Sequence, residues 1–187
     1  MFIALIPARG GSKGIKRKNI KEFCGLPLIA WTIKSALNSK KIDRVIVSTE
    51  DEEIAQIAKN YGAEVPFMRP LELCGDKVPN VANILHLLEE FSEAKDVLLL
   101  QPTSPLRETR DIDGIINFRN EHKAESAYSL TLCENHPSWM SRIDENFKTI
   151  PIAPKEKATC RRDLSKVYIL NGALYLGTRE YFMREKE

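Results

Sequence analysis

Three glycines and a cluster of basic side chains near the amino terminus suit the binding of a polyphosphate. Gly10, Gly11 and Gly14 interrupt regular structure and let the backbone come close to a ligand. The cationic side chains in and just beyond this segment are Arg9, Lys13, Lys16, Arg17, Lys18 and Lys21. Backbone amides can surround phosphate oxygens, and Lys or Arg can offset their charge. We interpret the segment as a phosphate-binding loop, with a solvated surface turn as the alternative.

The loop matches neither of two common phosphate-binding motifs. A Walker loop needs Gly, four residues and then Gly-Lys-Ser/Thr, but counting from Gly10 places Ile15 at the second Gly. A dinucleotide fingerprint begins with Gly-x-Gly, and this loop has no such pair. Its position after a strand predicted over Phe2–Ile6 still favours a ligand site, because open α/β sheets bind ligands beyond the carboxyl ends of their strands.

A second polar segment follows another short apolar strand, expected over Asp96–Leu100. Two prolines end that strand sharply and leave Gln101, Thr103, Ser104 and Arg107 at its carboxyl end. If the two strands are parallel, these side chains lie near the glycine-rich loop. The sequence therefore predicts one site built from two distant segments.

Hydrophobic patterning predicts strands that alternate with helices. Strands are expected at Phe2–Ile6, Arg44–Ser48, Glu64–Phe67, Asp96–Leu100, Ala127–Leu132 and Val167–Leu176. Helices are expected at Pro27–Asn38, from Thr49 to the stop at Gly62, at Pro79–Phe91 and at Thr109–Asn120. For the second helix, Thr49 and Glu52 have the spacing of a capping box. This order implies an α/β fold with a mainly parallel sheet covered on both faces.

Residues 133–166 depart from this alternation, since they contain three prolines and no long periodic run. We interpret them as an excursion from the main sheet, with short strands near Thr149–Ile152. At Asn171-Gly172 we expect an interruption of the last strand.

Composition narrows the class of protein. A chain of 187 residues is expected to form one domain, and a net charge of +2 argues against a surface that coats nucleic acid. No apolar run reaches the length of a membrane span, and the opening run is too short for a signal peptide. The four cysteines are widely spaced, which indicates neither a zinc site nor a disulfide framework. These features are typical of a cytoplasmic protein without a membrane partner.

The segments Ala8–Gly14 and Gln101–Arg107 together resemble the acylneuraminate cytidylyltransferase family (the CMP-sialic acid synthetases), which includes the legionaminic and pseudaminic acid cytidylyltransferases. Asn171–Tyr175 is a third match, and Arg69-Pro70 is a weaker one. The resemblance implies a three-layer Rossmann-like nucleotidyltransferase fold, with residues 1–187 as a single domain and 133–166 as a dimerisation arm. The carboxyl-terminal part of the family fold is expected to be missing from this chain.

The resemblance also implies an activity. A member of this family transfers CMP from CTP to the anomeric hydroxyl of a sialic-acid-like nonulosonic acid, releasing pyrophosphate, for cell-surface glycan synthesis. It implies Mg²⁺ as the companion of CTP, although no protein ligand for the metal can be assigned here. It further implies a homodimer that binds no nucleic acid and no membrane. Which nonulosonic acid is the acceptor stays open.

Carried over residue by residue, the resemblance implies two sets of site residues, with Arg9 and Lys13 as the catalytic pair. The nucleotide-binding set is Ala8, Arg9, Gly10, Gly11, Ser12, Lys13, Asn19, Arg69 and Asn80. The sugar-binding set is Gln101, Thr103, Ser104, Arg161, Asn171 and Tyr175. Whether Arg161 or its neighbour Arg162 faces the site is left open. Asn80 lies near the position where a relative uses a serine toward the base, and the resemblance implies that its amide takes that role.

Two alternatives remain at this stage. One is a different sugar or cofactor nucleotidyltransferase with the same opening loop, which the Gln101 segment argues against. The other is a non-catalytic nucleotide-binding module.

Overall fold

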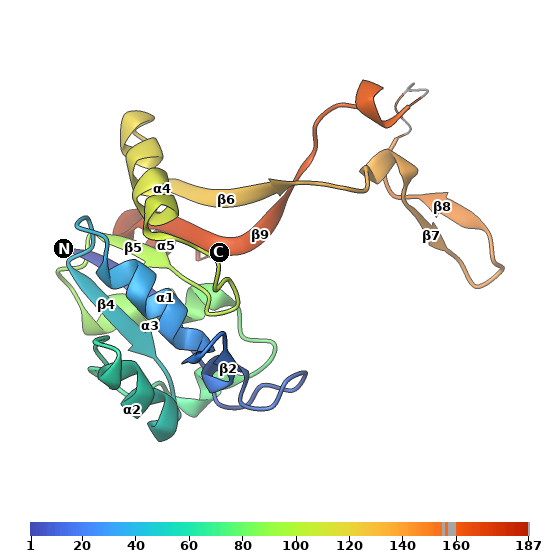
Figure 1. Cartoon of the computed structure of the whole chain (residues 1–187). Coiled ribbons are helices and arrows are strands. Elements are labelled where there is room, and N and C mark those ends of the chain that lie inside the picture. The colour runs from blue at the N-terminus through green and yellow to red at the C-terminus, as the bar shows by residue number, and fades with distance from the viewer. Residues whose placement is uncertain (155, 157–159, 187) are drawn as a thin grey trace. The chain divides into compact units, whose positions relative to one another are not determined.

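The computed structural model describes residues 1–154, 156 and 160–186. Its main sheet has five strands in the order β4-β1-β5-β9-β6 (Figure 1). Strands β1 (Phe2–Pro7), β4 (Arg44–Ser48) and β5 (Asp96–Leu99) are parallel, with β1 in the centre. Strand β9 (Tyr168–Thr178) runs antiparallel to β5, and β6 (Ser126–Leu132) lies at the edge beyond it. The predicted α/β class is confirmed, with antiparallel β9 as the exception to its parallel strands.

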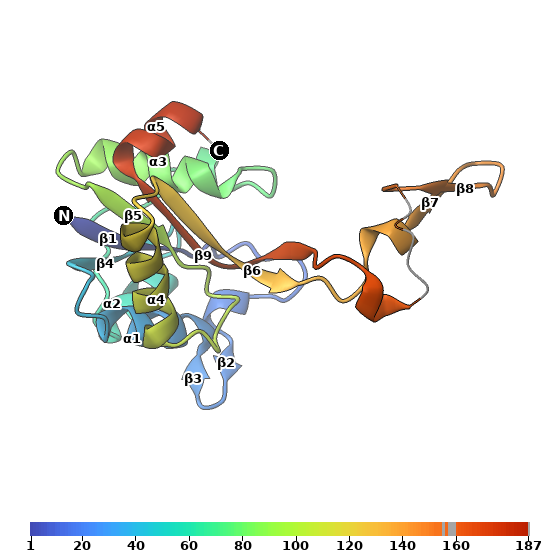
Figure 2. The ribbon, with the colours of Figure 1, turned by 90° about the horizontal axis from the view of Figure 1, so that it is seen from above.

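Helices cover both faces of this sheet (Figure 2). On one face lie α1 (Leu28–Leu37), α2 (Glu52–Asn60) and α4 (Thr109–Glu121). On the other face lie α3 (Asn80–Glu90) and α5 (Arg179–Glu185). These three layers are the Rossmann-like arrangement that the resemblance implied.

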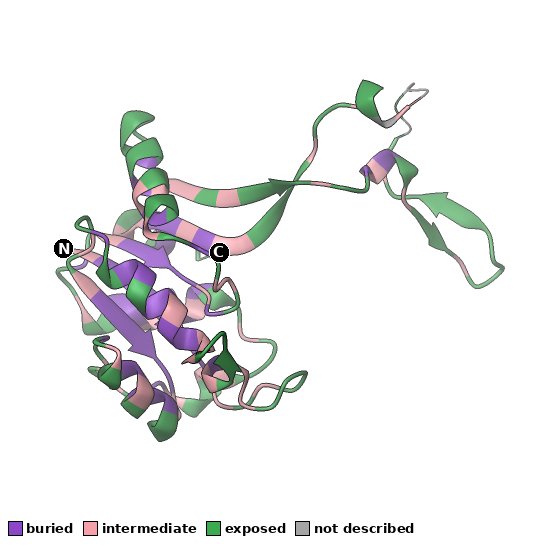
Figure 3. Ribbon diagram, viewed as in Figure 1, coloured by how far each residue is buried: buried purple, intermediate pink, exposed green. Residues whose placement is uncertain are grey.

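Alternation along the central strands builds the two cores. On β1, Ala4 and Ile6 pack toward α1, α2 and α4, whereas Ile3 and Leu5 pack toward α3 and α5. All four side chains are fully buried, so β1 is a continuous apolar run, as expected for a parallel strand covered on both faces. Figure 3 shows this burial along the central strands. The core therefore holds the carboxyl end of β1, and the loop after it, in a fixed position.

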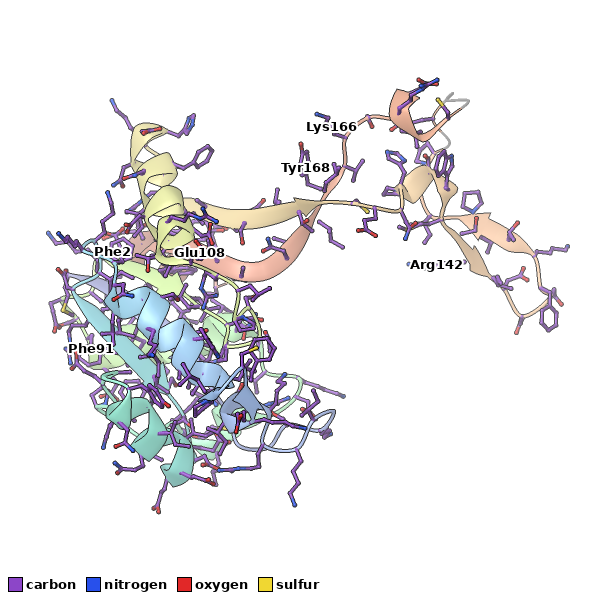
Figure 4. The ribbon with its side chains drawn as sticks, in the orientation of Figure 1. Phe2, Phe91, Glu108, Arg142, Lys166 and Tyr168 are labelled. Carbon is purple, nitrogen blue, oxygen red and sulfur yellow. The ribbon has the colours of Figure 1, made fainter. Side chains whose placement is uncertain are left out.

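Several helix starts differ from the sequence-based expectation. The cap of α2 is Asp51, whose side chain accepts a hydrogen bond from the amide of Ile54 at 3.0 Å. Thr49 was expected in that role, but its hydroxyl instead accepts from the amide of Asp51 at 3.1 Å. Similarly, α4 begins after Glu108, labelled in Figure 4, which forms a capping box with Asp111. The pattern located both helices and missed the caps, because adjacent residues could satisfy the same amides.

Four further features of the fold correct the predictions. The expected strand Glu64–Phe67 is reduced to an isolated bridge between Glu64 and Ile46. Strand β9 continues through Gly172, which absorbs a left-handed backbone (φ 77°) instead of ending the strand. The short hairpin of β2 (Glu22–Phe23) and β3 (Leu26–Pro27) was not predicted, nor was α5.

The chain divides into two compact units: unit 1 comprises Met1–Ser129 and Gly172–Glu187, and unit 2 comprises Leu130–Asn171. Within unit 2, β7 (Ser141–Ile143) pairs antiparallel with β8 (Thr149–Pro151). Short 3-10 turns occur in unit 1 at Lys18–Ile20 and Leu71–Cys74, and in unit 2 at Pro137–Trp139 and Arg161–Asp163. The expected excursion over 133–166 falls inside unit 2, and its strand near Thr149–Ile152 is confirmed. Its role as a dimerisation arm stays a prediction.

Candidate functional site

Unit 1 contains a cavity of about 370 Å³ beyond the carboxyl ends of β1 and β5. Polar and charged side chains dominate its lining, and small apolar residues fill the gaps between them. The lining residues are Pro7, Arg9, Ser12, Lys18, Asn19, Arg69, Leu73, Cys74, Gly75, Asp76, Val78, Pro79, Asn80, Asn83, Gln101, Pro102 and Thr103. The glycine-rich loop and the Gln101 segment therefore share one hollow, as the sequence predicted.

Two cations of the loop converge on one carboxylate. Arg9 forms an ion pair with Asp76 at 2.6 Å, and Lys13 pairs with the other oxygen of the same group. The hydrogen bond from Lys13, and secondarily that from Arg9, lowers the pKa of Asp76. Asp76 is the one carboxylate among the described residues that line the cavity. The two cations thus lie side by side, with Lys13 largely exposed, where an incoming phosphate can replace Asp76.

Hydrogen bonds from the side chains of Asn19 and Arg9 to backbone carbonyls also hold the loop in place. Asn19 is buried, and its side-chain amide donates to the carbonyl of Arg9 at 2.9 Å. The guanidinium of Arg9 donates to the carbonyl of Cys74 at 3.1 Å. Arg9 therefore connects the loop to the segment that precedes α3, and Asn19 fixes the backbone from which Arg9 projects.

The first acidic residues after β4 anchor the base of the glycine-rich loop. Glu50 accepts from the amide of Gly10 at 2.8 Å, and Asp51 pairs with the guanidinium of Arg17. A Cβ atom on residue 10 would overlap the Asp51 carboxylate, so a larger residue here would displace the side chain that pairs with Arg17. The hydrogen bond to Asp51 is the main influence that raises the pKa of Arg17. Both ends of the loop are thus fixed to the start of α2.

A buried chain of three side chains forms another wall of the cavity. Arg69, which is 5% exposed, donates to Glu50 at 3.0 Å and to Asn83 at 2.6 Å. Burial acts to raise the pKa of Glu50, but the hydrogen bonds from Arg69 and from backbone amides outweigh it and hold that pKa below its ordinary value. Glu50 therefore carries a negative charge and fixes both the loop and Arg69.

The Gln101 wall is braced by a buried arginine. Arg107 donates to the carbonyls of Ala173 at 2.7 Å and Gln101 at 3.3 Å, and to the hydroxyl of Thr32 at 2.8 Å. Burial lowers the pKa of Arg107 to about 10, with the charge of Asp111 acting in the opposite direction. Arg107 thus ties together the end of β5, the strand β9 and the helix α1, and it sets the backbone from which Gln101 projects.

Seven of the predicted site residues line the cavity directly. They are Arg9, Ser12, Asn19, Arg69, Asn80, Gln101 and Thr103. Lys13 reaches it through Asp76, whereas Gly10 and Ala8 support the loop, Ala8 being fully buried with its amide bonded to Ser48 at 2.9 Å. Gly11 and Ser104 adjoin lining residues in the chain but are not part of the lining.

Three members of the predicted sugar-binding set are not among the lining residues of the cavity in unit 1. Tyr175 pairs with Leu99 across the β5–β9 ladder and packs against the core on the α3 face. Asn171 belongs to unit 2. Arg161 lies in the short turn Arg161–Asp163 of the same unit, and its side chain falls outside the described residues. The roles of these residues stay predictions.

Sequence reasoning missed three residues that shape the site: Glu50, Asp76 and Asn83. Glu50 directly precedes the cap of α2 at Asp51, where acidic residues are common for reasons unrelated to a ligand. Asp76 lies in a segment without periodicity. Asn83 is a polar residue on the inward side of α3, and this was the one signal available in the sequence.

The arrangement suits a polyanion at one end and a hydrogen-bonding group at the other. Arg9, Lys13 and Lys18 supply positive charge, and two unit charges about 4 Å apart interact by several kcal/mol at an effective dielectric near 20. Among the described residues, no cluster of three or more His, Cys, Asp or Glu side chains forms a metal cage. Within residues 1–154, 156 and 160–186, no helix has the length and apolar character needed to cross a bilayer.

Comparison with known proteins agrees with the fold. The cytidylyltransferase family model matches residues 3–180. The N-acylneuraminate cytidylyltransferase of Escherichia coli O18:K1:H7 is 34% identical over 99% of this chain and 44% of its own length. The CMP-N,N'-diacetyllegionaminic acid synthase of Legionella pneumophila is 34% identical over 99% of this chain and 81% of its own length.

A similar fold occurs in a solved structure of a CMP:2-keto-3-deoxy-manno-octonic acid synthetase complexed with CTP. The TM-score is 0.75 at 17% identity, over 99% of this chain and 77% of that one. This likeness concerns the fold.

These findings identify the chain as an α/β protein of the nucleotidyltransferase type. More closely, it belongs to the cytidylyltransferase family. The chain spans less than half of the Escherichia coli relative and about four fifths of the Legionella relative.

Proposed function

We propose that this chain carries out transfer of CMP from CTP to the anomeric hydroxyl of a sialic-acid-like nonulosonic acid, with release of pyrophosphate. The observation that carries this proposal is the shared cavity, in which Arg9 and Gln101 approach from two distant segments. The names of the two bacterial relatives support the choice of nucleotide and of acceptor class. The reaction would take place in the cytoplasm, and its product would serve cell-surface glycan synthesis.

In this proposal the basic loop receives the triphosphate. Arg9 and Lys13 exchange Asp76 for phosphate oxygens, and Lys18 adds charge from the same side. Ser12 and the backbone of Gly11 lend hydrogen-bond donors, and Asn19 holds Arg9 in place. Arg69 and Asn80 face the base.

The acceptor enters beside Gln101. Gln101 and Thr103 contact the sugar acid, and Ser104 directly follows them in the chain. The anomeric oxygen forms a bond to the α-phosphorus, the bond to the bridging oxygen breaks, and pyrophosphate leaves while the hydroxyl proton passes to solvent. Such a transfer depends on positioning and on charge neutralisation, which the fixed cations supply.

Mg²⁺ is proposed to enter with CTP and to neutralise part of the triphosphate charge. Mg²⁺ keeps several waters and takes phosphate oxygens as ligands in nucleotide sites, so a protein cage is not required. The described lining offers a single carboxylate, Asp76, and that group is paired with Arg9 and Lys13. No protein ligand is therefore assigned to the metal, and no step is derived through it.

A homodimer is proposed on the basis of unit 2. Large apolar side chains of this unit are exposed, including Trp139, Ile143, Phe147, Ile150 and Ile152. Phe147 is the most exposed of them, at 89%. Exposed apolar surface of this kind favours contact with a protein partner. In Figure 4, Arg142 is labelled on β7 of the same hairpin. Sedimentation equilibrium should give twice the chain mass, and Phe147→Asp should reduce it to one.

The activity is tested by a pyrophosphate-release screen. CTP, UTP, GTP and ATP are each combined with N-acetylneuraminic, legionaminic, pseudaminic and 3-deoxy-octulosonic acids in the presence of Mg²⁺. We expect release with CTP and with at least one nine-carbon acid. Release that requires a different nucleotide would identify another nucleotidyltransferase. Binding of CTP without release, with every acceptor, would identify a nucleotide-binding module instead.

A further inference from the structure

Asn83 is a buried polar residue on the wall of the cavity. Its side chain is 5% exposed and lies on α3, one turn after Asn80. Its carbonyl oxygen accepts a hydrogen bond from Arg69 at 2.6 Å. Among the described residues, none forms a hydrogen bond with the amide nitrogen of Asn83. This nitrogen is also not one of the buried side-chain atoms that lack a hydrogen-bond partner, so it is accessible to solvent. That nitrogen is therefore reached from the cavity, which Asn83 helps to line.

The orientation of the Asn83 amide is determined by chemistry. A guanidinium has only hydrogen-bond donors, so Asn83 must present its oxygen to Arg69. The amide group cannot flip without bringing donor against donor. Because Arg69 is itself fixed by Glu50 at 3.0 Å, the nitrogen of Asn83 is held as a donor toward the cavity.

The wall made by Arg69 and Asn83 consequently offers donors. The first amides of α3 add to them, because the cap residue Pro79 makes no side-chain hydrogen bond to them. Pyrimidine bases differ in what they present to such a wall. Cytosine has acceptors at both O2 and N3, whereas uracil has a donor, N3–H, at the second position. A wall of fixed donors matches the first edge and meets the second donor to donor.

We propose that Asn83 is a nucleotide-specificity residue whose amide nitrogen donates to N3 or O2 of cytosine and thereby rejects uracil. This inference rests on the proposed function, since it needs the base to lie at the Arg69 end of the cavity. The cationic loop at Arg9 and Lys13 receives the phosphates, which leaves the Arg69–Asn83 wall for the base. Glu50 and Arg69 act with Asn83 by holding its amide in one orientation.

The variant Asn83→Asp separates a base contact from a merely structural role. Aspartate keeps an oxygen for Arg69, and a carboxylate strengthens that hydrogen bond. It replaces the donor facing the base with an acceptor. If Asn83 only supports Arg69, the variant should retain its preference for CTP. If Asn83 contacts the base, the carboxylate repels N3 of cytosine and accepts from N3–H of uracil.

We expect the ratio of kcat/KM for CTP to that for UTP to fall about 100-fold in Asn83→Asp. The dissociation constants measured by calorimetry should shift in the same direction, and the melting temperature should stay at or above the parental value. Asn83→Ala, which removes both contacts, should lower CTP affinity about tenfold without favouring UTP. Asn120→Asp makes the same chemical change at an exposed position of α4 and serves as the matched control.

The outcomes distinguish the two levels of the argument. If the parental chain neither binds CTP nor releases pyrophosphate from it, the proposed function is wrong. If the parental chain prefers CTP and folded Asn83→Asp keeps the same CTP-to-UTP ratio, the function stands and the role of Asn83 is wrong.

Discussion

The carboxylate of Glu50 pairs with the guanidinium of Arg69 at 3.0 Å, and its other oxygen accepts from the amide of Gly10 at 2.8 Å. One side chain thus fixes the position of the glycine-rich loop and that of Arg69 on another wall of the cavity. Both members of the pair are mostly buried, so neither can exchange its partner for water. The cavity is therefore organised before any ligand enters, which lowers the cost of ordering on binding.

Glu50→Gln should weaken both the fold and nucleotide binding. Glutamine can accept from only one of the two partners through its single oxygen, which leaves the buried charge of Arg69 without a counter-ion. We expect the free energy of unfolding to fall by about 1–3 kcal/mol in urea titrations. Glu52→Gln changes an exposed acid two positions away and should alter that free energy by less than about 0.5 kcal/mol. Equal effects of the two substitutions would contradict the proposed bracing role.

The same carboxylate predicts a defined pH dependence. Because the pKa of Glu50 is lowered in the folded state, its contribution to stability is fully present above pH 4.5, the ordinary value, and is lost as pH falls through the lowered pKa. The difference in unfolding free energy between the parental chain and Glu50→Gln should therefore be constant near neutrality and shrink below pH 4.5. Urea titrations between pH 7 and pH 3 measure it. A difference that grows in acid would reverse the sign and refute the assignment.

Arg9→Ala and Lys13→Ala should each give a folded protein with little transferase activity. Both side chains are at least one third exposed, so their loss removes little packing, but each removes a positive charge from the triphosphate site. We expect kcat/KM to fall by at least about 100-fold, with unfolding midpoints near the parental value. Lys59→Ala, an exposed lysine on α2, is the control. Near-normal turnover in either loop variant would argue against the phosphate-binding role.

Asp76→Asn should strengthen the binding of pyrophosphate. Asp76 occupies the space between Arg9 and Lys13, where it competes with an incoming phosphate for both cations. Removing its charge should lower the dissociation constant for pyrophosphate up to about fivefold, and the gain should diminish at high salt. Calorimetry at two salt concentrations measures both effects. Weaker binding would mean that Asp76 supports the bound state.

The sequence predicted the layers of the fold because they follow from local patterns. The apolar run before Pro7 and that of Arg44–Ser48 match β1 and β4 closely, since buried parallel strands are continuous apolar runs. The direction of β9 could not be predicted in this way. A strand in either direction has the same alternation, and only its pairing with β5 decides between them.

The sequence predicted the site residues that adjoin a glycine or a proline. It did not predict those whose role depends on a contact with a residue distant in the chain. Arg9 and Gln101 stand next to breaks in regular structure, where chain direction changes and function concentrates. Glu50 and Asn83 lie at helix starts, where acidic and amide residues are common for other reasons. Their roles depend on Arg69, which is 14 residues from Asn83 in the chain, and no local pattern encodes that contact.

Arg107→Lys should destabilise the fold and impair use of the sugar acid more than use of CTP. Arg107 is 7% exposed and donates to two backbone carbonyls and to Thr32, a set that one ammonium cannot reproduce in the same geometry. We expect a loss of about 2–4 kcal/mol in the free energy of unfolding, because a buried charge and its acceptors lose their pairing. Arg107 holds the backbone carbonyl of Gln101, the residue proposed to contact the sugar acid. KM for the sugar acid should therefore rise more than KM for CTP. Arg110→Lys changes an exposed arginine three positions on and should leave both KM values and the unfolding free energy near the parental level. A parallel rise in both KM values would show that Arg107 supports the whole cavity instead of the Gln101 wall.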